Sequence, residues 1–297
     1  MGLAPYGNPV YLEELNSVFG SPEKHIYSIN DLNIYSDRLF SPNLERNLGF
    51  SLREPSDPLL QKYADLAASV QLYLEKAVCS YIDHAIREMH LNPNTTLFLG
   101  GGIALNCKLN LVISEKYKDF FGEIWCFPAA GDSGSAVGAC YNYNFTKGYN
   151  VQKVDNLHSS QFEHCYLGPE YLAKDIKTTL ESSTFKYTNF NSDESKLVIS
   201  KLISGEVGAI FEGRSEFGPR ALGKRSIIGN PCSENTLIHI NRHIKSREDF
   251  RPLAPIILEE YVEDFFVLNS NAINLSEYML VLARCKEEIP LRERMDS

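Results

Sequence analysis

The sequence predicts an α/β fold, and three features predict it. Apolar residues recur at helical spacing over residues 59–90, just after Asp57-Pro58, a pair typical of a helix start, which predicts one long helix or two abutting ones. Two strand–glycine turn–helix units then follow, with strands expected at residues 95–99 and 123–128. This succession indicates an α/β domain that binds its ligand at the carboxyl ends of the strands.

The rest of the chain is predicted to continue as α/β or α+β. Residues 1–56 are rich in Pro, Asn, Ser and Gly, which favours turns and short strands. Residues 148–165 lose periodicity and are expected to link a first domain, 1–147, to a second, 166–297. In the second domain helices are expected at 171–181, 194–204 and 234–243, and strands at 207–211 and 253–258.

Composition indicates a soluble globular protein. At 297 residues, 43% apolar and 23% charged, the chain is long enough for two domains. No apolar run approaches the roughly 20 residues of a membrane span, and the N-terminus lacks a signal-peptide pattern. The seven scattered cysteines include no Cys-x-x-Cys pair, so we expect reduced core residues in a cytoplasmic protein.

The charge distribution predicts a site for a small anion. A net charge of −9 argues against a general nucleic-acid binder. Residues 213–251 nevertheless contain eight Arg or Lys against four Asp or Glu. A local excess of positive charge within an acidic protein favours a confined anion pocket over a broad nucleic-acid surface.

Two basic stretches carry this excess. Residues 213–226 combine three glycines and a proline, which permit tight turns, with four cationic side chains and Ser226. Arginine suits bidentate binding of phosphate or carboxylate oxygens. The alternative is a solvated basic loop with weak surface ion pairs. In the second stretch, 241–252, Lys245 and Arg251 flank a turn-forming segment, so both are expected to reach the pocket of the first loop.

Both stretches match a known signature. Residues 216–227 (Glu-Phe-Gly-Pro-Arg-Ala-Leu-Gly-x-Arg-Ser-Ile) and 244–255 (Ile-Lys-x-Arg-Glu-x-Phe-Arg-Pro-x-Ala-Pro) resemble the C-terminal signature of the carbamoyltransferase family, which includes antibiotic O-carbamoyltransferases and nodulation carbamoyltransferases. The resemblance implies a YrdC-like α/β domain over 166–297 that binds carbamoyl phosphate and, with ATP, makes carbamoyl-adenylate. On the matching positions it implies Arg220, Lys245 and Arg251 as the catalytic anion-binding residues. Further candidates for substrate binding are Arg214, Arg225, Ser226 and Arg247.

The upstream half is similar to the same family. Residues 1–7 resemble a segment from the interior of the family's first domain, and residues 65–71 resemble its long helix. Residues 100–106 resemble the adenosine-binding turn of the actin-like and sugar-kinase-like ATPase fold, which implies that 1–147 is the C-terminal part of such a domain. The implied nucleotide-binding residues are Gly100, Gly101, Gly102, Asn106 and Ser133. The glycines could equally form a tight strand–helix connection, and Asn106 could be structural.

Asp132 is the implied metal ligand. It follows a predicted strand within the glycine-flanked segment 128–139, where a carboxylate can hold a divalent metal beside a nucleotide. The alternative is that Asp132 caps the next helix. The resemblance implies iron or magnesium without deciding between them.

The match covers nearly all of this chain, but the chain covers only about half of the family's length. The upstream part of the family's first domain, which the resemblance implies carries a His-x-x-x-His metal pair, is not matched by this chain, so weak or no acceptor carbamoylation is expected of the isolated chain. His239 and His243 have this spacing in the second half, but no carboxylate or Cys partner stands at metal-site spacing from them. We expect an ATP-dependent O-carbamoyltransferase that uses carbamoyl phosphate and a small hydroxyl-bearing acceptor. Two alternatives remain open: an inactive or split fragment that binds anions or a complementary chain, and a protein related to tRNA threonylcarbamoylation, which the acidic net charge disfavours. Besides the substrates, the partners considered are a complementary chain or a second copy.

Overall fold

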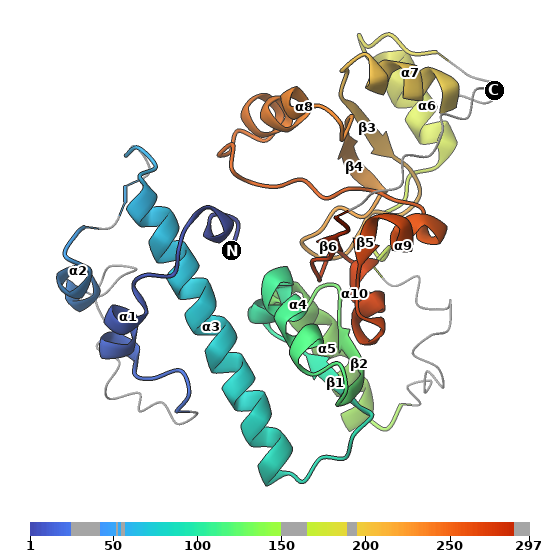
Figure 1. The fold of residues 1–297 in the computed structure, drawn as a ribbon. Helices are drawn as coiled ribbons and strands as arrows, with labels where there is room; N and C mark the ends of the chain where they lie inside the picture. The colour runs from blue at the N-terminus through green and yellow to red at the C-terminus, as the bar shows by residue number, and fades with distance from the viewer. Residues whose placement is uncertain (25–41, 52, 55–56, 150–164, 189–194, 288–297) are drawn as a thin grey trace.

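The computed structural model describes residues 1–24, 42–51, 53–54, 57–149, 165–188 and 195–287. The chain is a mixed helix-and-sheet protein, as expected. Figure 1 shows its longest helix, α3 (Gln61–Glu88), between the helices α1 (Leu12–Phe19) and α2 (Pro42–Leu48) on one side and the first strand pair on the other.

The first half is mainly helical around one pair of strands. The long helix and the two strand–turn–helix units predicted from the sequence are present in that order. After η1 (Ala4–Tyr6) and helices α1 to α3, its elements are β1 (Thr95–Leu99), the 3-10 turn η3 (Gly102–Leu105), α4 (Cys107–Lys116), β2 (Phe121–Cys126) and α5 (Asp132–Thr146).

The second half consists of shorter elements. They are α6 (Ala173–Ser182), α7 (Ser195–Ile203), β3 (Gly208–Phe211), β4 (Arg225–Ile228), α8 (Glu234–His239), the π-helical turn η4 (Ile240–Ile244), η5 (Glu259–Tyr261), α9 (Val262–Phe265), β5 (Phe266–Val267), η6 (Ser270–Ala272), α10 (Ile273–Ser276) and β6 (Arg284–Cys285).

Three strand pairs form the sheet structure of the described residues. β1 and β2 are parallel and connected through α4, with Leu97 opposite Ile124, which is the arrangement of a β–α–β unit. The pairs β3–β4 and β5–β6 are antiparallel. The parallel pair follows from the predicted strands, whereas β4 lies in a stretch for which the sequence predicted only a loop.

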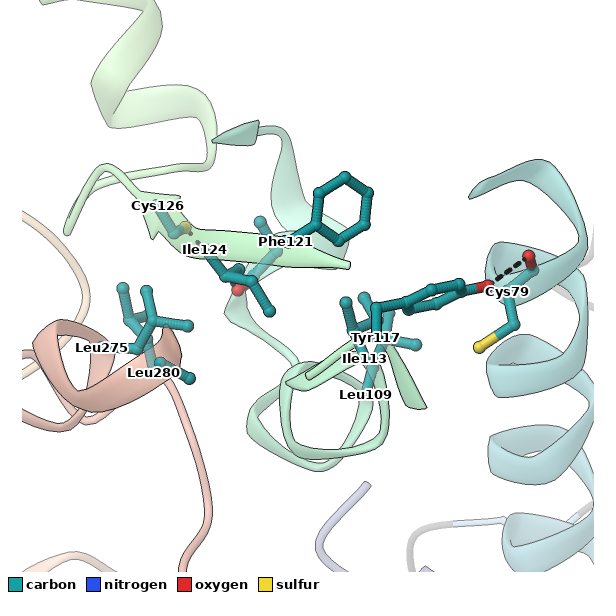
Figure 2. Close-up of a cluster of buried hydrophobic side chains, with 11 residues drawn as sticks. Cys79, Leu109, Ile113, Tyr117, Phe121, Ile124, Cys126, Leu275 and Leu280 are labelled. Carbon is teal, nitrogen blue, oxygen red and sulfur yellow. Dashed lines mark hydrogen bonds between the residues drawn. The ribbon is translucent and has the colours of Figure 1, made fainter. Parts of the chain in front are cut away.

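The main hydrophobic core joins the first half to the end of the described chain. Ile113 and Ile124, from α4 and β2, pack with Leu275 and Leu280; Figure 2 shows these side chains in one cluster. The Asn110 side-chain amide also donates to the Leu280 main-chain oxygen at 2.6 Å. The segment around α10 is therefore part of the core of the first half.

The N-terminal segment lies directly on α3. A Cβ atom on Gly7 would come within 2.1 Å of the Ala64 backbone, so only glycine permits this contact. The Asn8 backbone N–H donates to the Asp65 carboxylate at 2.8 Å, and the Tyr11 N–H donates to the Ser69 hydroxyl at 3.0 Å. The segments 1–7 and 65–71, both picked out by the resemblance, are thus packed against each other.

The prediction of short strands for residues 1–56 is wrong where the structure describes them: turns are present, but α1 and α2 form in place of strands. α1 forms because Leu15 and Val18, three residues apart, are buried on one face against α3. Gly20 ends the helix with a φ of 83°. Packing against α3, rather than the local amino-acid composition, therefore determines that this segment is helical.

Two predictions in the second half are corrected. Residues 253–258 form no strand, and Ile256 is 79% exposed, because no neighbouring strand among the described residues pairs with this segment. The single helix expected over 234–243 is α8 followed by η4, in which the Lys245 N–H bonds the Ile240 oxygen at 2.9 Å. Most of the expected linker, 150–164, lies outside the described residues.

The structure also bears on two expectations that were drawn from the composition. All seven cysteines are free, as predicted, but the expectation that they are core residues holds for four of them only: Cys79, Cys107, Cys126 and Cys165 are buried, whereas Cys140, Cys232 and Cys285 are exposed. Within the described part of the chain, none of the helices combines the length and apolar character that crossing a bilayer would need.

Candidate functional site

The first basic loop is organised by Glu216. One oxygen of its carboxylate accepts hydrogen bonds from the backbone N–H groups of Leu222 at 2.8 Å, Lys224 at 2.8 Å and Arg225 at 3.2 Å. Partial burial opposes ionisation, but these bonds hold the pKa of the Glu216 carboxyl below its usual range. These three backbone N–H groups could otherwise bind an anion, but they are already bonded to a carboxylate of the chain itself.

Arg225 also supports this loop. Its guanidinium donates to the main-chain oxygens of Glu212 at 2.7 Å and Gly213 at 3.0 Å, and lies 3.7 Å from the centre of the Phe211 ring. A stacked guanidinium that is hydrogen-bonded to backbone carbonyls fixes the β3–β4 connection.

Ser226 and Arg214 are likewise engaged with the backbone. The Ser226 hydroxyl is buried and accepts from the Gly223 N–H at 2.9 Å. Arg214 donates to the Leu167 oxygen at 3.0 Å. Neither residue lines the cationic pocket described below. Their predicted role in substrate binding stays a prediction, and the contacts seen here are structural.

Arg220 lies at the nucleotide turn proposed from the sequence. Its guanidinium donates to the Leu105 main-chain oxygen at 3.1 Å and to the Cys107 sulfur at 3.5 Å. Its Nε atom is buried and has no hydrogen-bond partner among the described residues. Arg220 thus joins the second-half loop to the segment between η3 and α4.

Three sequence motifs meet at this point. A Cβ atom on Gly218, whose φ is 130°, would lie 3.2 Å from the Ala129 Cβ and 3.3 Å from the Pro128 oxygen, so glycine allows close packing there. Gly131 faces Leu105 in the same region. The segments 100–106, 128–135 and 216–226 therefore form one junction, which the sequence did not predict.

The glycine turn before η3 is open. Gly101 has a φ of 80°, which favours glycine, and a Cβ atom on Gly100, Gly101 or Gly102 would meet no other heavy atom within 4 Å. Asn106 caps α4, because its side chain accepts from the Leu109 N–H at 3.1 Å. The structural role considered for Asn106 is therefore present, while its nucleotide contact stays a prediction.

Asp132 and Ser133 are exposed at the start of α5. Gly131, not Asp132, occupies the N-cap, and no side chain caps the helix, so the alternative that Asp132 caps it is wrong. Across the described ranges, no group of three or more His, Cys, Asp or Glu residues could hold a metal ion. Asp132 thus does not form a metal site with the described residues, and its metal role stays a prediction.

The second basic stretch forms an open cationic pocket of about 590 Å³. Its lining residues are Arg242, Ser246, Arg247, Glu248 and Arg251. Two of the three arginines are paired: Arg251 donates to Glu248 at 2.9 Å, and Arg242 donates to Asp249 at 2.7 and 2.9 Å.

Arg247 is the third cation of this pocket. It donates to the Asn241 side-chain oxygen at 2.7 Å, and no carboxylate of the described residues lies within ion-pair distance of it. Burial and the nearby charge of Arg251 lower the pKa of Arg247 from its usual value. Two guanidinium groups that repel each other favour an anion between them.

The structure divides the predicted anion-binding residues into two groups. Arg247 and Arg251 share the cationic pocket, and Lys245 is exposed in the same turn without lining the pocket. Arg220 lies at the junction with Leu105 instead. The expectation that Arg220, Lys245 and Arg251 surround one anion is therefore not met by the pocket lining, and the role of each residue stays a prediction.

Arg242 and Ser246 also line this pocket, and neither was predicted as a site residue, although both lie in the basic stretch 241–252. The signal was present, because Arg242 precedes a helix end and Ser246 has a φ of 45° in the turn that carries Arg247. Only folding of the turn reveals that these side chains share a pocket.

Comparison with known proteins identifies the family of this chain. Residues 1–141 match the family model for the carbamoyltransferase N-terminus, and residues 199–296 match the one for the carbamoyltransferase C-terminus. The two matches contain all the predicted site residues.

Several curated proteins are similar over most of this chain. Nodulation protein NolO of Bradyrhizobium diazoefficiens is 32% identical over 290 residues, 97% of this chain and 49% of that protein. Nodulation protein NolNO of Sinorhizobium fredii is 33% identical over 90% of this chain and 37% of its own length. An uncharacterized Synechocystis protein is 37% identical over 98% and 47% respectively. The chain spans about half the length of these relatives or less. It belongs to the carbamoyltransferase family.

Proposed function

We propose that this chain takes part in ATP-dependent carbamoyl transfer from carbamoyl phosphate, through carbamoyl-adenylate, to a hydroxyl group of a small-molecule acceptor. The observation that carries the proposal is that Arg247 and Arg251 line the same pocket, in a segment that matches the carbamoyltransferase C-terminus.

Arg247 and Arg251 are proposed to bind the phosphate group of carbamoyl phosphate, with Lys245 approaching from the same turn. Each guanidinium can hold two phosphate oxygens through parallel N–H donors. Hydrolysis of carbamoyl phosphate by water gives carbamate and phosphate, and it places charge on the oxygens of the departing phosphate. Fixed cations stabilise that charge without reorganising during the reaction.

Arg220 is proposed to act at the junction, where its buried Nε atom lies beside the segment that follows the glycine turn. Gly100 and Gly102 need no left-handed backbone and pack against no side chain, which supports close approach of a nucleotide to this turn. ATP would supply the adenylyl group that activates the carbamate. The α5 N-terminus, with Ser133, lies at the same junction and favours phosphate binding.

The described residues do not fit the divalent metal implied by the resemblance, because Asp132 has no neighbouring ligand cluster. No step of the proposal depends on a metal. The exposed helices α5 and α7, in which no residue is buried, favour a further layer of polypeptide against them. We therefore include a complementary chain or a second copy among the proposed partners.

Pyrophosphate release tests the proposal. The chain should release pyrophosphate from ATP only when carbamoyl phosphate is present, because adenylation of the carbamate expels pyrophosphate. Arg251→Ala should abolish this release. Arg284→Ala should not, because Arg284 is exposed, pairs with Glu115 and does not line the cationic pocket. Intact carbamoyl phosphate binding without any pyrophosphate release, in the chain alone and with its partner, would contradict the adenylation step.

A further inference from the structure

A second pocket lies beside the cationic one. It has a volume of about 450 Å³, within the usual range for small-molecule sites. Five separate parts of the chain line it: the N-terminal residues Met1 and Leu3, the residues Arg53 and Leu59, one face of α3, Asn106 just before α4, and the loop residue Phe250. Phe250 directly precedes Arg251 of the cationic pocket, so the two pockets are adjacent.

The walls of this second pocket are mostly hydrocarbon. Three of the apolar side chains are substantially exposed although they line a concave surface: Met1 at 49%, Leu59 at 44% and Val70 at 48%. Leu3, Leu66 and Leu74 add further aliphatic surface. Exposed apolar groups gathered in a cavity indicate a ligand with an apolar body.

Two amide side chains, together with Arg53 and Tyr63, provide the polar part of the lining. Gln71 is 7% exposed, and its Nε2 atom donates to the Glu75 carboxylate at 2.9 Å and to the Asn106 Oδ1 atom at 3.3 Å. The Asn106 Nδ2 atom donates to the Gln71 Oε1 atom at 3.0 Å. Asn106 Oδ1 also accepts from the Leu109 N–H. Both protons of Gln71 Nε2 and both acceptor positions of Asn106 Oδ1 are therefore used.

This pair retains one donor and one acceptor. Asn106 Nδ2 has a second proton and Gln71 Oε1 has a second lone pair, for which the described residues provide no partner. The two atoms are 3.0 Å apart, so they can bond to a single ligand atom. A hydroxyl oxygen both donates and accepts, and it satisfies both positions at once.

We propose that this pocket is the acceptor site and that it holds an alcohol with an apolar body, one of whose hydroxyl groups bonds the Gln71–Asn106 pair. This inference rests on the proposed function and specifies its acceptor. The body of the acceptor fills the aliphatic cavity, and its position beside Phe250 places it next to the carbamoyl phosphate site. The amide pair then selects for a hydroxyl, because an ether cannot donate to Gln71 Oε1.

Ligand-observed NMR titration of the full chain with 4-tert-butylcyclohexanol and with its methyl ether tests the inference. The alcohol should bind about tenfold more tightly than the ether, as expected for one additional hydrogen bond. Gln71→Leu should remove the difference. Equal binding of the two compounds to the unmodified chain, or no binding of either, would overturn the inference.

Two variants locate the binding. Val70→Trp, on the pocket wall, should abolish alcohol binding, whereas Tyr81→Trp, further along α3 and outside the pocket, should leave it unchanged. Unchanged binding in Val70→Trp would place the alcohol elsewhere and refute the site. Displacement of the alcohol by adenosine would also refute it, since the pocket would then hold the nucleotide base.

The carbamoyl phosphate titration of the same samples separates this inference from the proposed function. If carbamoyl phosphate binds and depends on Arg251 while the alcohol fails to bind, only the acceptor site is wrong. If carbamoyl phosphate does not bind while the alcohol does, the proposed function fails and the pocket is still a site for alcohols.

Discussion

The guanidinium of Arg220 donates a hydrogen bond to the main-chain oxygen of Leu105, 115 residues earlier in the chain. This bond connects the glycine-rich loop of the second half to the turn that precedes α4. The segments that match the N-terminal and the C-terminal carbamoyltransferase models therefore share one junction, and the separate cationic pocket lies beyond it in the loop 242–251.

Arg220→Ala should lower the free energy of unfolding by about 1–3 kcal/mol, because it removes charge-assisted bonds at a half-buried position. Carbamoyl phosphate affinity should remain within about threefold, since Arg220 does not line the cationic pocket. Urea unfolding and calorimetric titration measure the two effects. A large loss of affinity with unchanged stability would assign Arg220 to the anion itself.

Glu216→Gln should destabilise the chain at pH 7 by about 1–2 kcal/mol, because three backbone N–H groups lose a charged acceptor. The folded pKa of Glu216 is lowered, so its contribution is complete above the unfolded pKa of about 4.3 and is lost as pH falls through the folded pKa. The difference between wild type and variant should therefore shrink at about pH 3.

Urea midpoints at both pH values provide this measurement, and Glu212→Gln is the control. Glu212 is exposed and pairs with Lys224, so its substitution should cost less than about 1 kcal/mol at pH 7. A Glu216→Gln effect as small as that of the control would show that the carboxylate does not organise the loop.

Gly7→Ala should destabilise the chain by about 2–3 kcal/mol, because the added Cβ would overlap the backbone of α3 at Ala64. Gly138→Ala is the matched control: this glycine lies in α5 with open space around it, and alanine there should stabilise the helix by about 0.5–1 kcal/mol. Thermal unfolding compares them. Equal melting temperatures for both variants would show that the N-terminal segment does not pack on α3.

Leu280→Ala should lower the unfolding free energy by about 2–5 kcal/mol, because it opens a cavity in the core of Figure 2. Trp125, the single tryptophan, lies in β2 and reports unfolding of the first half by fluorescence. Leu282→Ala should have a small effect, since that side chain is 44% exposed. A Trp125 transition unaffected by Leu280→Ala would mean that the end of the described chain is independent of the first half.

The spacing of apolar residues along the chain correctly predicted the longest helix and the first strand. The helical spacing over 59–90 gave α3, and the apolar run 95–99 gave β1 with the same bounds. Residues 253–258 carry an equally apolar run, yet a strand needs a neighbour to accept its hydrogen bonds, and sequence does not show whether one is present. β4 was missed for the converse reason, because its pairing with β3 is set by the Glu216-centred loop.

Residues of the candidate site could be predicted from the sequence, but which of them lie together could not. The motifs supplied Arg220, Arg247 and Arg251, but side-chain direction separated Arg220 from the other two. Gln71 and Asn106 are 35 residues apart, and nothing in their spacing indicates that they bond each other. Contacts of this kind depend on how α3 packs against the start of α4.

Calorimetric titration of carbamoyl phosphate into the full chain tests the central claim most directly. The unmodified chain should bind it, and Arg247→Ala and Arg251→Ala should each weaken binding at least about tenfold, as expected for loss of a charge-assisted contact. Arg284→Ala should bind as the unmodified chain does. Undiminished binding in both pocket variants, or no binding to the unmodified chain, would contradict the assignment of this pocket to carbamoyl phosphate.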